Sequence, residues 1–171
     1  MTAVYAEIYL ENLVTENGDW LAFPLDEEEI TNFIVEKKIS TNFNPEYRIA
    51  DYMFDGCDLQ VSEFDDVYRI NELLERFYQL DRYEQAKVNA YMEINFNSVD
   101  TFEQAMDSLD RYELVEDIST DEELGIYCAD GLFTQDIPRV FENYFDFEAY
   151  GRDARIEGYA TFTKYGCLFN Y

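Results

Sequence analysis

The chain has 171 residues, of which 38 are acidic and 12 are basic, so its formal net charge at pH 7 is −26. Hydrophobic residues make up 47% and aromatic residues 18%, which excludes a disordered acidic tail as the source of the acidity, because such tails are poor in aromatics. Because this charge repels nucleic acids and anionic lipids, we expect neither as a direct partner; a basic protein surface or a cation is expected instead.

The first third of the chain predicts a small sheet. In residues 4–10 apolar and polar side chains alternate, which is typical of a half-buried strand. Asn17-Gly18 predicts a turn, and residues 20–25 predict the strand that returns from it. Residues 46–54 predict a third strand.

One helix is predicted between the second and third strands. Asp26 and Glu29 have the spacing of a capping box, in which each side chain binds a backbone N–H at the start of a helix. The predicted inner face of this helix is Ile30, Phe33 and Ile34.

The middle of the chain predicts three helices. Asp81 and Ser98 are the predicted N-caps of the second and third of them. The side chains predicted to face inward are Val67, Ile70, Leu74 and Phe77 in the first helix, Ala86, Ala90 and Ile94 in the second, and Phe102, Met106 and Leu109 in the third.

The last third predicts a mixture of helices and short strands. Residues 112–115 predict a strand, and Ser119 with Glu122 is the predicted cap of a helix that ends at Gly131. Pro138 is well placed as the first residue of another helix. Residues 159–163 and 167–171 predict a hairpin.

Together these elements predict an α+β protein built as an elongated chain of three small subdomains. The expected division is an N-terminal sheet with a helix in residues 1–61, a central helical domain in residues 62–104, and a C-terminal α+β domain in residues 105–171.

The sequence offers no sign of catalysis. It has no histidine, which removes the usual general base and the commonest metal ligand, and it has no glycine-rich phosphate loop. In the calcium-loop frame 51–62 the ligand positions 3 and 12 hold Met53 and Ser62. We therefore expect no catalytic, cofactor or metal site, and a protein that is not an enzyme.

Several features favour a cytoplasmic protein. Cys57, Cys128 and Cys167 are odd in number and far apart, which is typical of a reducing compartment. The first 13 residues lack the pattern of a signal peptide, and no apolar stretch reaches 18 residues.

Acidic residues follow the third central helix with helical spacing. Residues 100, 103, 107 and 110 are all acidic and are predicted to share one helix face, with separations of about 5 Å that are comparable to those of phosphates along a DNA strand. An ordinary solvated helix face is the alternative, although such faces usually alternate Lys with Glu. The predicted partner-binding acids are Asp65, Asp66, Glu72, Glu75, Asp100, Glu103, Asp107, Asp110, Glu116, Asp117, Asp121 and Glu122.

The final 35 residues differ from the rest of the chain. They contain five acidic and four basic residues together with ten aromatics. Low net charge with many aromatics is typical of a protein–protein interface, and an ordinary aromatic core is the alternative. Because two highly acidic copies repel each other elsewhere, we expect a homodimer through this segment.

Several short segments resemble the ArdA family of antirestriction proteins over nearly the full length of the chain. Residues 20–26 resemble the family's W-x-x-F-P-[IL]-D, and residues 70–73 fall where the family has an I-x-E-L-N-like helix start. The C-terminal motif D-[VI]-P…Y-[FI]-D is matched by residues 136–138 and 144–146, and A-x-x-R-D by residues 149–153. Ala50 and Arg139 depart from the family, which often has His and an acid there.

The resemblance implies a curved protein of three domains that dimerises through the last one. It implies a mimic of bent B-form DNA, encoded on mobile elements such as plasmids and conjugative transposons, that occupies the DNA groove of type I restriction–modification enzymes in the bacterial cytoplasm. The residues expected in the motif and dimer interface are Asp136, Ile137, Pro138, Phe141, Tyr144, Phe145, Asp146 and Tyr150.

Two alternatives remain open from the sequence. The same acidic surface could inhibit another DNA-binding target, such as a CRISPR nuclease or a nucleoid protein. From a different class, so many carboxylates would also suit an acidic metal-binding protein or a metal-dependent hydrolase.

Overall fold

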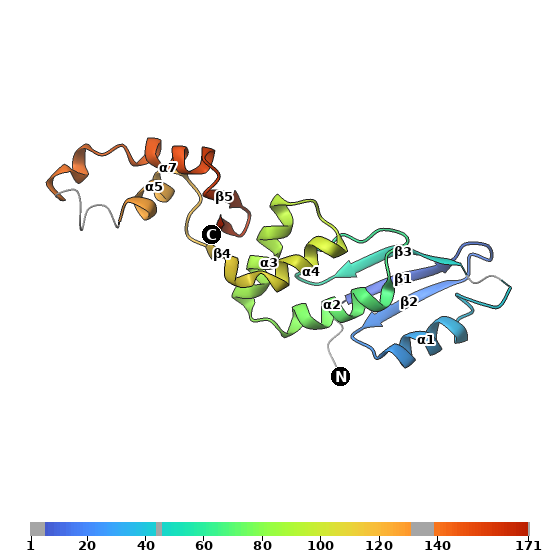
Figure 1. Ribbon diagram of the computed structural model, residues 1–171. Helices are drawn as coiled ribbons and strands as arrows, with labels where there is room; N and C mark the ends of the chain where they lie inside the picture. The colour runs from blue at the N-terminus through green and yellow to red at the C-terminus, as the bar shows by residue number, and fades with distance from the viewer. Residues whose placement is uncertain (1–5, 44–45, 131–138, 171) are drawn as a thin grey trace.

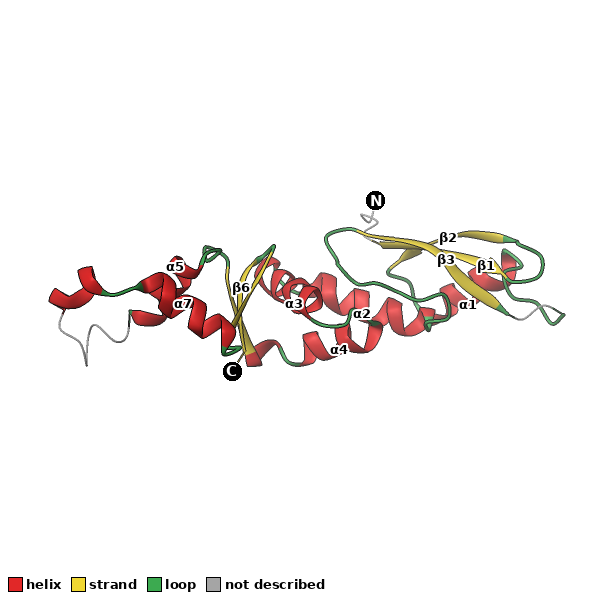
Figure 2. Cartoon of the chain, turned by 90° about the horizontal axis from the view of Figure 1, so that it is seen from above, coloured by secondary structure: helices red, strands yellow, loops and turns green. Residues whose placement is uncertain are grey.

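The structure is a computed structural model that describes residues 6–43, 46–130 and 139–170. It is an elongated α+β protein (Figure 1). A three-stranded sheet lies at one end, helices fill the middle, and a second small sheet with further helices forms the other end (Figure 2).

The N-terminal sheet confirms the three predicted strands, with ends shifted by one or two residues. β1 is Ala6–Asn12, β2 is Gly18–Phe23 and β3 is Tyr47–Phe54, in the antiparallel order β2-β1-β3. Residues 4 and 5 of the predicted first strand lie outside the described residues.

The first helix begins where its cap predicts. In α1 (Glu27–Glu36) the Asp26 carboxylate accepts a hydrogen bond from the Glu29 backbone N–H at 2.8 Å, and the Glu29 side chain accepts one from the Asp26 N–H at 3.0 Å. Ile30 and Ile34 are buried, which confirms the predicted inner face.

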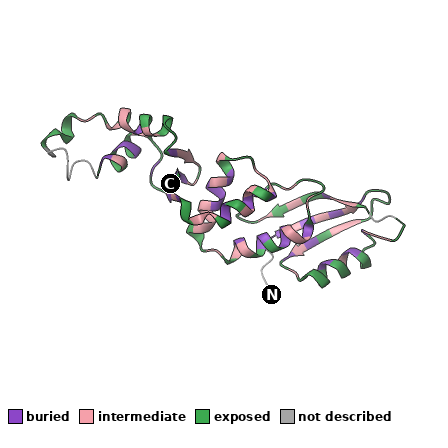
Figure 3. Ribbon diagram, in the orientation of Figure 1, coloured by how far each residue is buried: buried purple, intermediate pink, exposed green. Residues whose placement is uncertain are grey.

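The three central helices are also confirmed. They are α2 (Val67–Gln79), α3 (Arg82–Ile94) and α4 (Val99–Asp107), with Asp81 and Ser98 as the N-caps of the last two. One buried apolar cluster runs from Ala6 to Met106 and joins these helices to the N-terminal sheet (Figure 3). The sheet and the central helices therefore share a core, and the predicted subdomain limits stay a prediction.

The predicted inner face of α3 is confirmed, but it is only one of two buried sides of this helix. Val88 and Met92 enter the main core, whereas Ala90 belongs to a second cluster with residues of the C-terminal sheet. The predicted inner residues Ala86 and Ile94 are partly buried against that second cluster. Apolar residues at helical spacing show that one face of a helix is buried, but they do not show which other element covers that face.

The C-terminal part contains a mixed set of short elements. Their bounds are η1 Leu109–Arg111, β4 Tyr112–Val115, α5 Asp121–Ala129, η2 Arg139–Tyr144, α7 Phe147–Ile156, β5 Ala160–Thr163 and β6 Gly166–Asn170. The strands form the sheet β4-β6-β5, which confirms the predicted strand and hairpin. Gly131 and Pro138, the predicted limits of two helices, lie outside the described residues.

The predicted cap of α5 was wrong by one residue. The N-cap is Thr120, whose hydroxyl accepts from the Glu123 N–H at 3.2 Å, while the Glu123 carboxylate accepts from the Thr120 N–H at 3.0 Å. Two overlapping pairs, Ser119 with Glu122 and Thr120 with Glu123, fit the same sequence pattern. Ser119 adds a further hydrogen bond to the Glu123 carboxylate, which favours the second pair.

Two glycines bring α5 and α7 into backbone contact. A Cβ atom on Gly125 would lie 1.8 Å from the carbonyl oxygen of Phe147, and one on Gly151 would lie 1.9 Å from that of Asp121. Only residues without a side chain allow this approach. The Arg155 guanidinium donates to both oxygens of Asp121, at 2.8 and 3.1 Å, and so ties the two helices together a second time.

The C-terminal hairpin is fixed to the central region through Asp58. The Tyr165 hydroxyl donates to the Asp58 carboxylate at 2.8 Å, and the Lys164 ammonium lies 2.8 Å from the same oxygen. The Lys164 backbone N–H donates to Glu93 on α3 at 3.2 Å. These contacts, with the second cluster on α3, hold the two ends of the elongated body in one arrangement.

Candidate functional site

The predicted acidic helix face is crossed by arginines of the neighbouring helix. Arg69 on α2 contacts both Asp100, at 2.6 Å, and Glu103 on α4. About two turns further along α2, Arg76 contacts Asp107 at 2.6 Å. The prediction that four acids share one helix was wrong for Asp110, because α4 ends at Asp107, and the other three acids are already paired with arginines.

These ion pairs lie at the surface, and their arginines stay positively charged. Hydrogen bonds to Glu103 and Asp100 raise the pKa of Arg69 above its ordinary value, so its guanidinium stays charged across the physiological range. The side chain of Arg69 is 39% exposed, which means that water and salt screen the interaction. Arginines of α2 therefore alternate with acids of α4 on this surface, as opposite charges do on an ordinary solvated helix face.

Three of the predicted partner-binding acids, and Asp146 of the predicted motif, make local structural contacts. Asp66 caps α2 by accepting from the Tyr68 N–H at 2.9 Å, and Asp146 caps α7 by accepting from the Ala149 N–H at 2.9 Å. Asp65 accepts from the Ser62 N–H at 2.7 Å. Asp121 pairs with Arg155, which lowers the pKa of its carboxyl.

The other predicted acids are free to meet a partner. They are exposed, and none has an ion pair or side-chain hydrogen bond with the residues that the structure describes. This set, called the free acids below, consists of Glu72, Glu75, Asp110, Glu116, Asp117 and Glu122.

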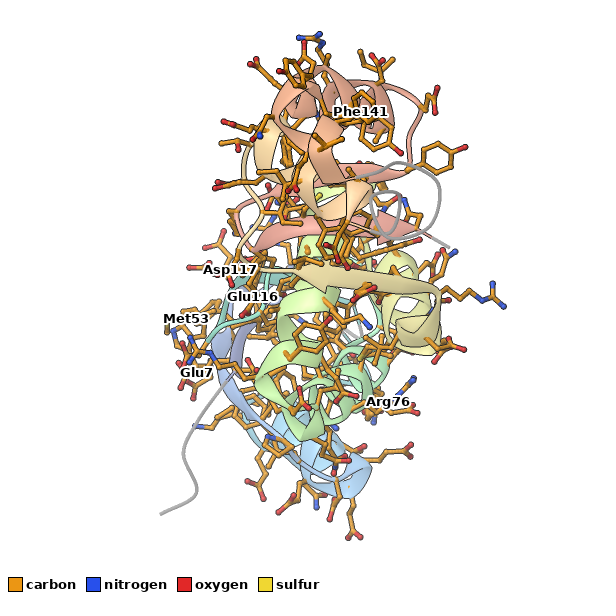
Figure 4. The ribbon with its side chains drawn as sticks, turned by 90° about the vertical axis from the view of Figure 1, so that its left-hand side faces the viewer. Glu7, Met53, Arg76, Glu116, Asp117 and Phe141 are labelled. Carbon is orange, nitrogen blue, oxygen red and sulfur yellow. The ribbon has the colours of Figure 1, made fainter. Side chains whose placement is uncertain are left out.

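The free acids do not share one side of the molecule. Figure 4 looks along the long axis from the C-terminal end and shows Glu116 and Asp117 on one side, with Arg76 of α2 on the other. Glu72 and Glu75 lie on α2, so carboxylates are offered in more than one direction around the body.

An open groove of about 510 Å³ gathers several acids beside α2. It is formed where the start of α1 meets α2, and it is lined by Asp26, Glu27, Asp66, Glu72 and Glu75 together with Arg69, Leu25, Tyr68 and Asn71. A basic side chain of a partner would find five carboxylates there and one competing guanidinium.

The side chain of Asn71 on α2 joins the two walls of this groove by binding the backbone of Leu25. It is buried, its amide donates to the Leu25 carbonyl at 2.8 Å, and its oxygen accepts from the Leu25 N–H at 3.0 Å. The two short segments singled out from the sequence, residues 20–26 and 70–73, therefore contact each other directly. Their pairing was not predicted, because 46 residues separate the two partners.

The aromatic tail divides into exposed and packed residues. Phe141 and Tyr144 are 55% and 86% exposed (Figure 4 labels Phe141), whereas the ring of Phe145 packs against Phe147 and Tyr150 with centroids 5.0 and 5.3 Å apart. Of the predicted motif and interface residues, Asp136, Ile137 and Pro138 lie outside the described residues. Both predicted roles, an aromatic core and an exposed apolar surface, thus occur in the same segment.

The described residues contain neither a metal-binding cluster nor a membrane-spanning helix. No group of three or more His, Cys, Asp or Glu side chains in residues 6–43, 46–130 and 139–170 is arranged to hold a metal ion. Within the same ranges no helix is long and apolar enough to cross a membrane.

Comparison with protein-family models matches residues 14–169 to a family described as antirestriction protein (ArdA). This match covers all of the helices named above, the groove, the free acids and every strand except β1, which lies before residue 14; it ends one residue before the end of β6. No individually curated protein matches the chain.

Proposed function

Given that the chain belongs to the ArdA family of antirestriction proteins, we propose that it inhibits type I restriction–modification enzymes as a mimic of DNA. Its acidic surface would occupy the basic groove that these enzymes use to bind DNA. The observation that carries this proposal is an elongated, stably packed body with a net charge of −26 and free acids along its length.

The mechanism is competition with DNA for the DNA-binding groove of the restriction enzyme. A groove rich in Lys and Arg gains much of its affinity for DNA from the phosphate charge. An acidic protein obtains similar Coulomb attraction, and because its carboxylates are held by helices and strands, little ordering is needed on binding. It also offers no phosphodiester bond to cleave.

The first prediction concerns salt. Adding the chain to a purified type I restriction–methylation complex should block DNA binding, and its inhibition constant should rise at least about tenfold between about 50 and about 200 mM salt, because salt screens attraction between opposite charges. Cleavage and methylation should be scored separately, with a CRISPR nuclease tested beside the type I enzyme.

An inhibition constant that does not change with salt would contradict the mimicry mechanism. Equal inhibition of both enzymes would mean that charge alone selects the target, whereas inhibition of the nuclease only would point to another DNA-binding target.

We further propose that two copies associate through the near-neutral C-terminal segment. The exposed apolar side chains there include Val140, Phe141, Tyr144, Ile156 and Tyr159. Such a patch is typical of an interface, and elsewhere two copies of this charge repel each other.

The second prediction tests this association. The native chain should sediment as a dimer at micromolar concentration, and the double variant Phe141→Ser/Tyr144→Ser should be a monomer with an unchanged far-UV circular dichroism spectrum. Phe96→Ser is the matched control, since Phe96 is 87% exposed and lies outside the segment, and it should leave the dimer intact. A monomeric native chain, or a dimeric double variant, would rule out this interface.

A further inference from the structure

One face of the N-terminal sheet is left uncovered by the described residues. In β1, Ala6, Ile8 and Leu10 are buried against the helices, so Glu7, Tyr9 and Glu11 point to the opposite side. Figure 2 shows the helices on one side of the sheet only. The outward side chains include Trp20, which is 40% exposed, and Met53, which is 60% exposed.

The strand register places acids and apolar groups side by side. Tyr9 lies opposite Trp20 on β2 and opposite Asp51 on β3. In the adjacent row Glu7 lies opposite Ala22 and Met53. Glu7, Tyr9, Trp20, Asp51 and Met53 are called the outer sheet face below.

A bulge in β3 produces this arrangement. The register shifts between Tyr9 and Leu10, because Tyr9 pairs with Asp51 whereas Leu10 pairs with Ile49, and Ala50 is the extra residue. Without the bulge, Asp51 would fall on the same side as the buried Ile49. The extra residue therefore places Asp51 on the outer side of the sheet, beside Tyr9.

The aromatic part of the face is held in place. The rings of Tyr9 and Trp20 meet edge to face, with centroids 5.4 Å apart. A side chain at Gly18 would lie 2.7 Å from the Tyr9 ring, so the glycine leaves room for that ring to lie across the strand. Two fixed rings present a π-surface of the kind that attracts cations.

Among the described residues, no cation pairs with the carboxylates of this face. Glu11, in the next row, already accepts from Arg48 at 2.9 and 3.1 Å. By contrast, Glu7 is half-buried and has no ion pair or hydrogen bond with the described residues. The Asp51 carboxylate is held by the Tyr52 N–H at 2.8 Å, and no described cation pairs with it. The Arg48–Glu11 pair shows that a guanidinium fits against a carboxylate on this side of the sheet, and Glu7 and Asp51 could each accept one in the same way.

We propose that the outer sheet face binds an arginine-bearing segment of a protein partner. The planar guanidinium would lie over the Tyr9–Trp20 pair, stacked on one of the two rings, and pair with Glu7 and Asp51, while its methylene stem would lie along Met53. Arginine suits the face better than lysine, because it both stacks and presents a rigid fork of donors to carboxylates. An apolar centre makes this contact different in kind from purely Coulombic attraction.

The outer sheet face is also separate from the α2–α4 ion pairs. Figure 4 shows Glu7 and Met53 on the side of the molecule opposite Arg76, and on the same side as Glu116 and Asp117. Glu116 and Asp117 lie further along the molecule on that side, in the turn after β4. The face would thereby anchor a basic partner at one point, while the free acids attract it over a wider area.

The test uses the single tryptophan of the chain, Trp20, as a reporter. Hexa-arginine and hexa-lysine peptides are titrated separately into the full chain while Trp20 emission is followed, and labelled peptides give the affinities by anisotropy. Hexa-arginine should shift the emission and bind about tenfold more tightly than hexa-lysine. The double variant Glu7→Gln/Asp51→Asn should lose this preference.

The matched control is Glu72→Gln/Glu75→Gln, which removes the same charge from α2 and should keep both the preference for arginine and the emission shift. Equal binding of the two peptides, or a preference that survives Glu7→Gln/Asp51→Asn, would overturn the proposal. The titration contains no restriction enzyme, so failure of DNA mimicry would leave its outcome unchanged.

Discussion

Replacing Gly125 or Gly151 by alanine is expected to destabilise the C-terminal part by about 3 kcal/mol or more, because overpacked sites with no room to relax cost the most. The added methyl group would overlap a backbone carbonyl of the facing helix at 1.8 or 1.9 Å. A backbone cannot move aside as a flexible side chain can, so α5 and α7 would have to separate. Denaturant unfolding followed by circular dichroism measures the loss.

Gly56→Ala is the control for this prediction. Gly56 has a positive φ of 65°, and a Cβ there would meet nothing within 4 Å. Its cost is therefore conformational only, about 1 kcal/mol. Combining both helix substitutions should cost less than their sum, since one separation relieves both overlaps. Equal, small losses at all three glycines would show that the helices are not in backbone contact.

Reversing free acids is expected to weaken inhibition of the restriction enzyme at least about tenfold at low salt, since like charges facing a basic groove repel. The triple variant Glu72→Lys/Glu75→Lys/Asp110→Lys changes only exposed side chains without described partners. Reversing Asp100, Glu103 and Asp107 instead would place lysines against Arg69 and Arg76, and would test folding rather than binding.

The control for the charge reversal changes net charge by the same amount elsewhere. Glu28, Glu36 and Glu46 are exposed, make no described side-chain contact and lie outside the C-terminal segment, so Glu28→Lys/Glu36→Lys/Glu46→Lys should retain most of the inhibition. Melting temperatures of both variants verify folding. If the two variants lost inhibition equally, total charge and not the position of the free acids would govern binding.

Local signals in the sequence predicted most of the secondary structure. The caps at Asp26 and Asp81 act within four residues of chain, so they can be read without knowledge of the tertiary fold. The strands of both sheets followed from alternation and turn residues in the same way. Thr120 shows the limit of such signals, because two overlapping caps satisfied one pattern.

Contacts between distant residues were not predictable. The arginine that neutralises Asp100 and Glu103 lies 31 and 34 residues earlier, and nothing local distinguishes it from any other surface arginine. The hydrogen bonds between Asn71 and Leu25 also depend on how α2 docks on the sheet. The candidate acids were therefore found by composition, but only the folded chain separated the free ones from those already paired.

The outer sheet face had a partial signal in the sequence. Glu7 and Tyr9 occupy alternate positions of a half-buried strand, which predicts that they point away from the core. Asp51 could not be placed in the same way, because the bulge at Ala50 inverts the alternation of β3.

The two buried sides of α3 also bear on the order in which the protein is made. A ribosome delivers residues 82–94 before residues 112–170, so the main core can close around Val88 and Met92 while the opposite side of the helix still lacks its cover. Ala90 is buried only when Tyr112, Leu114 and Leu168 pack against it, and Leu168 is close to the last residue synthesised. During synthesis α3 thus serves as the template on which the final sheet assembles, and a chain stopped before β6 would leave that apolar strip exposed to chaperones and proteases.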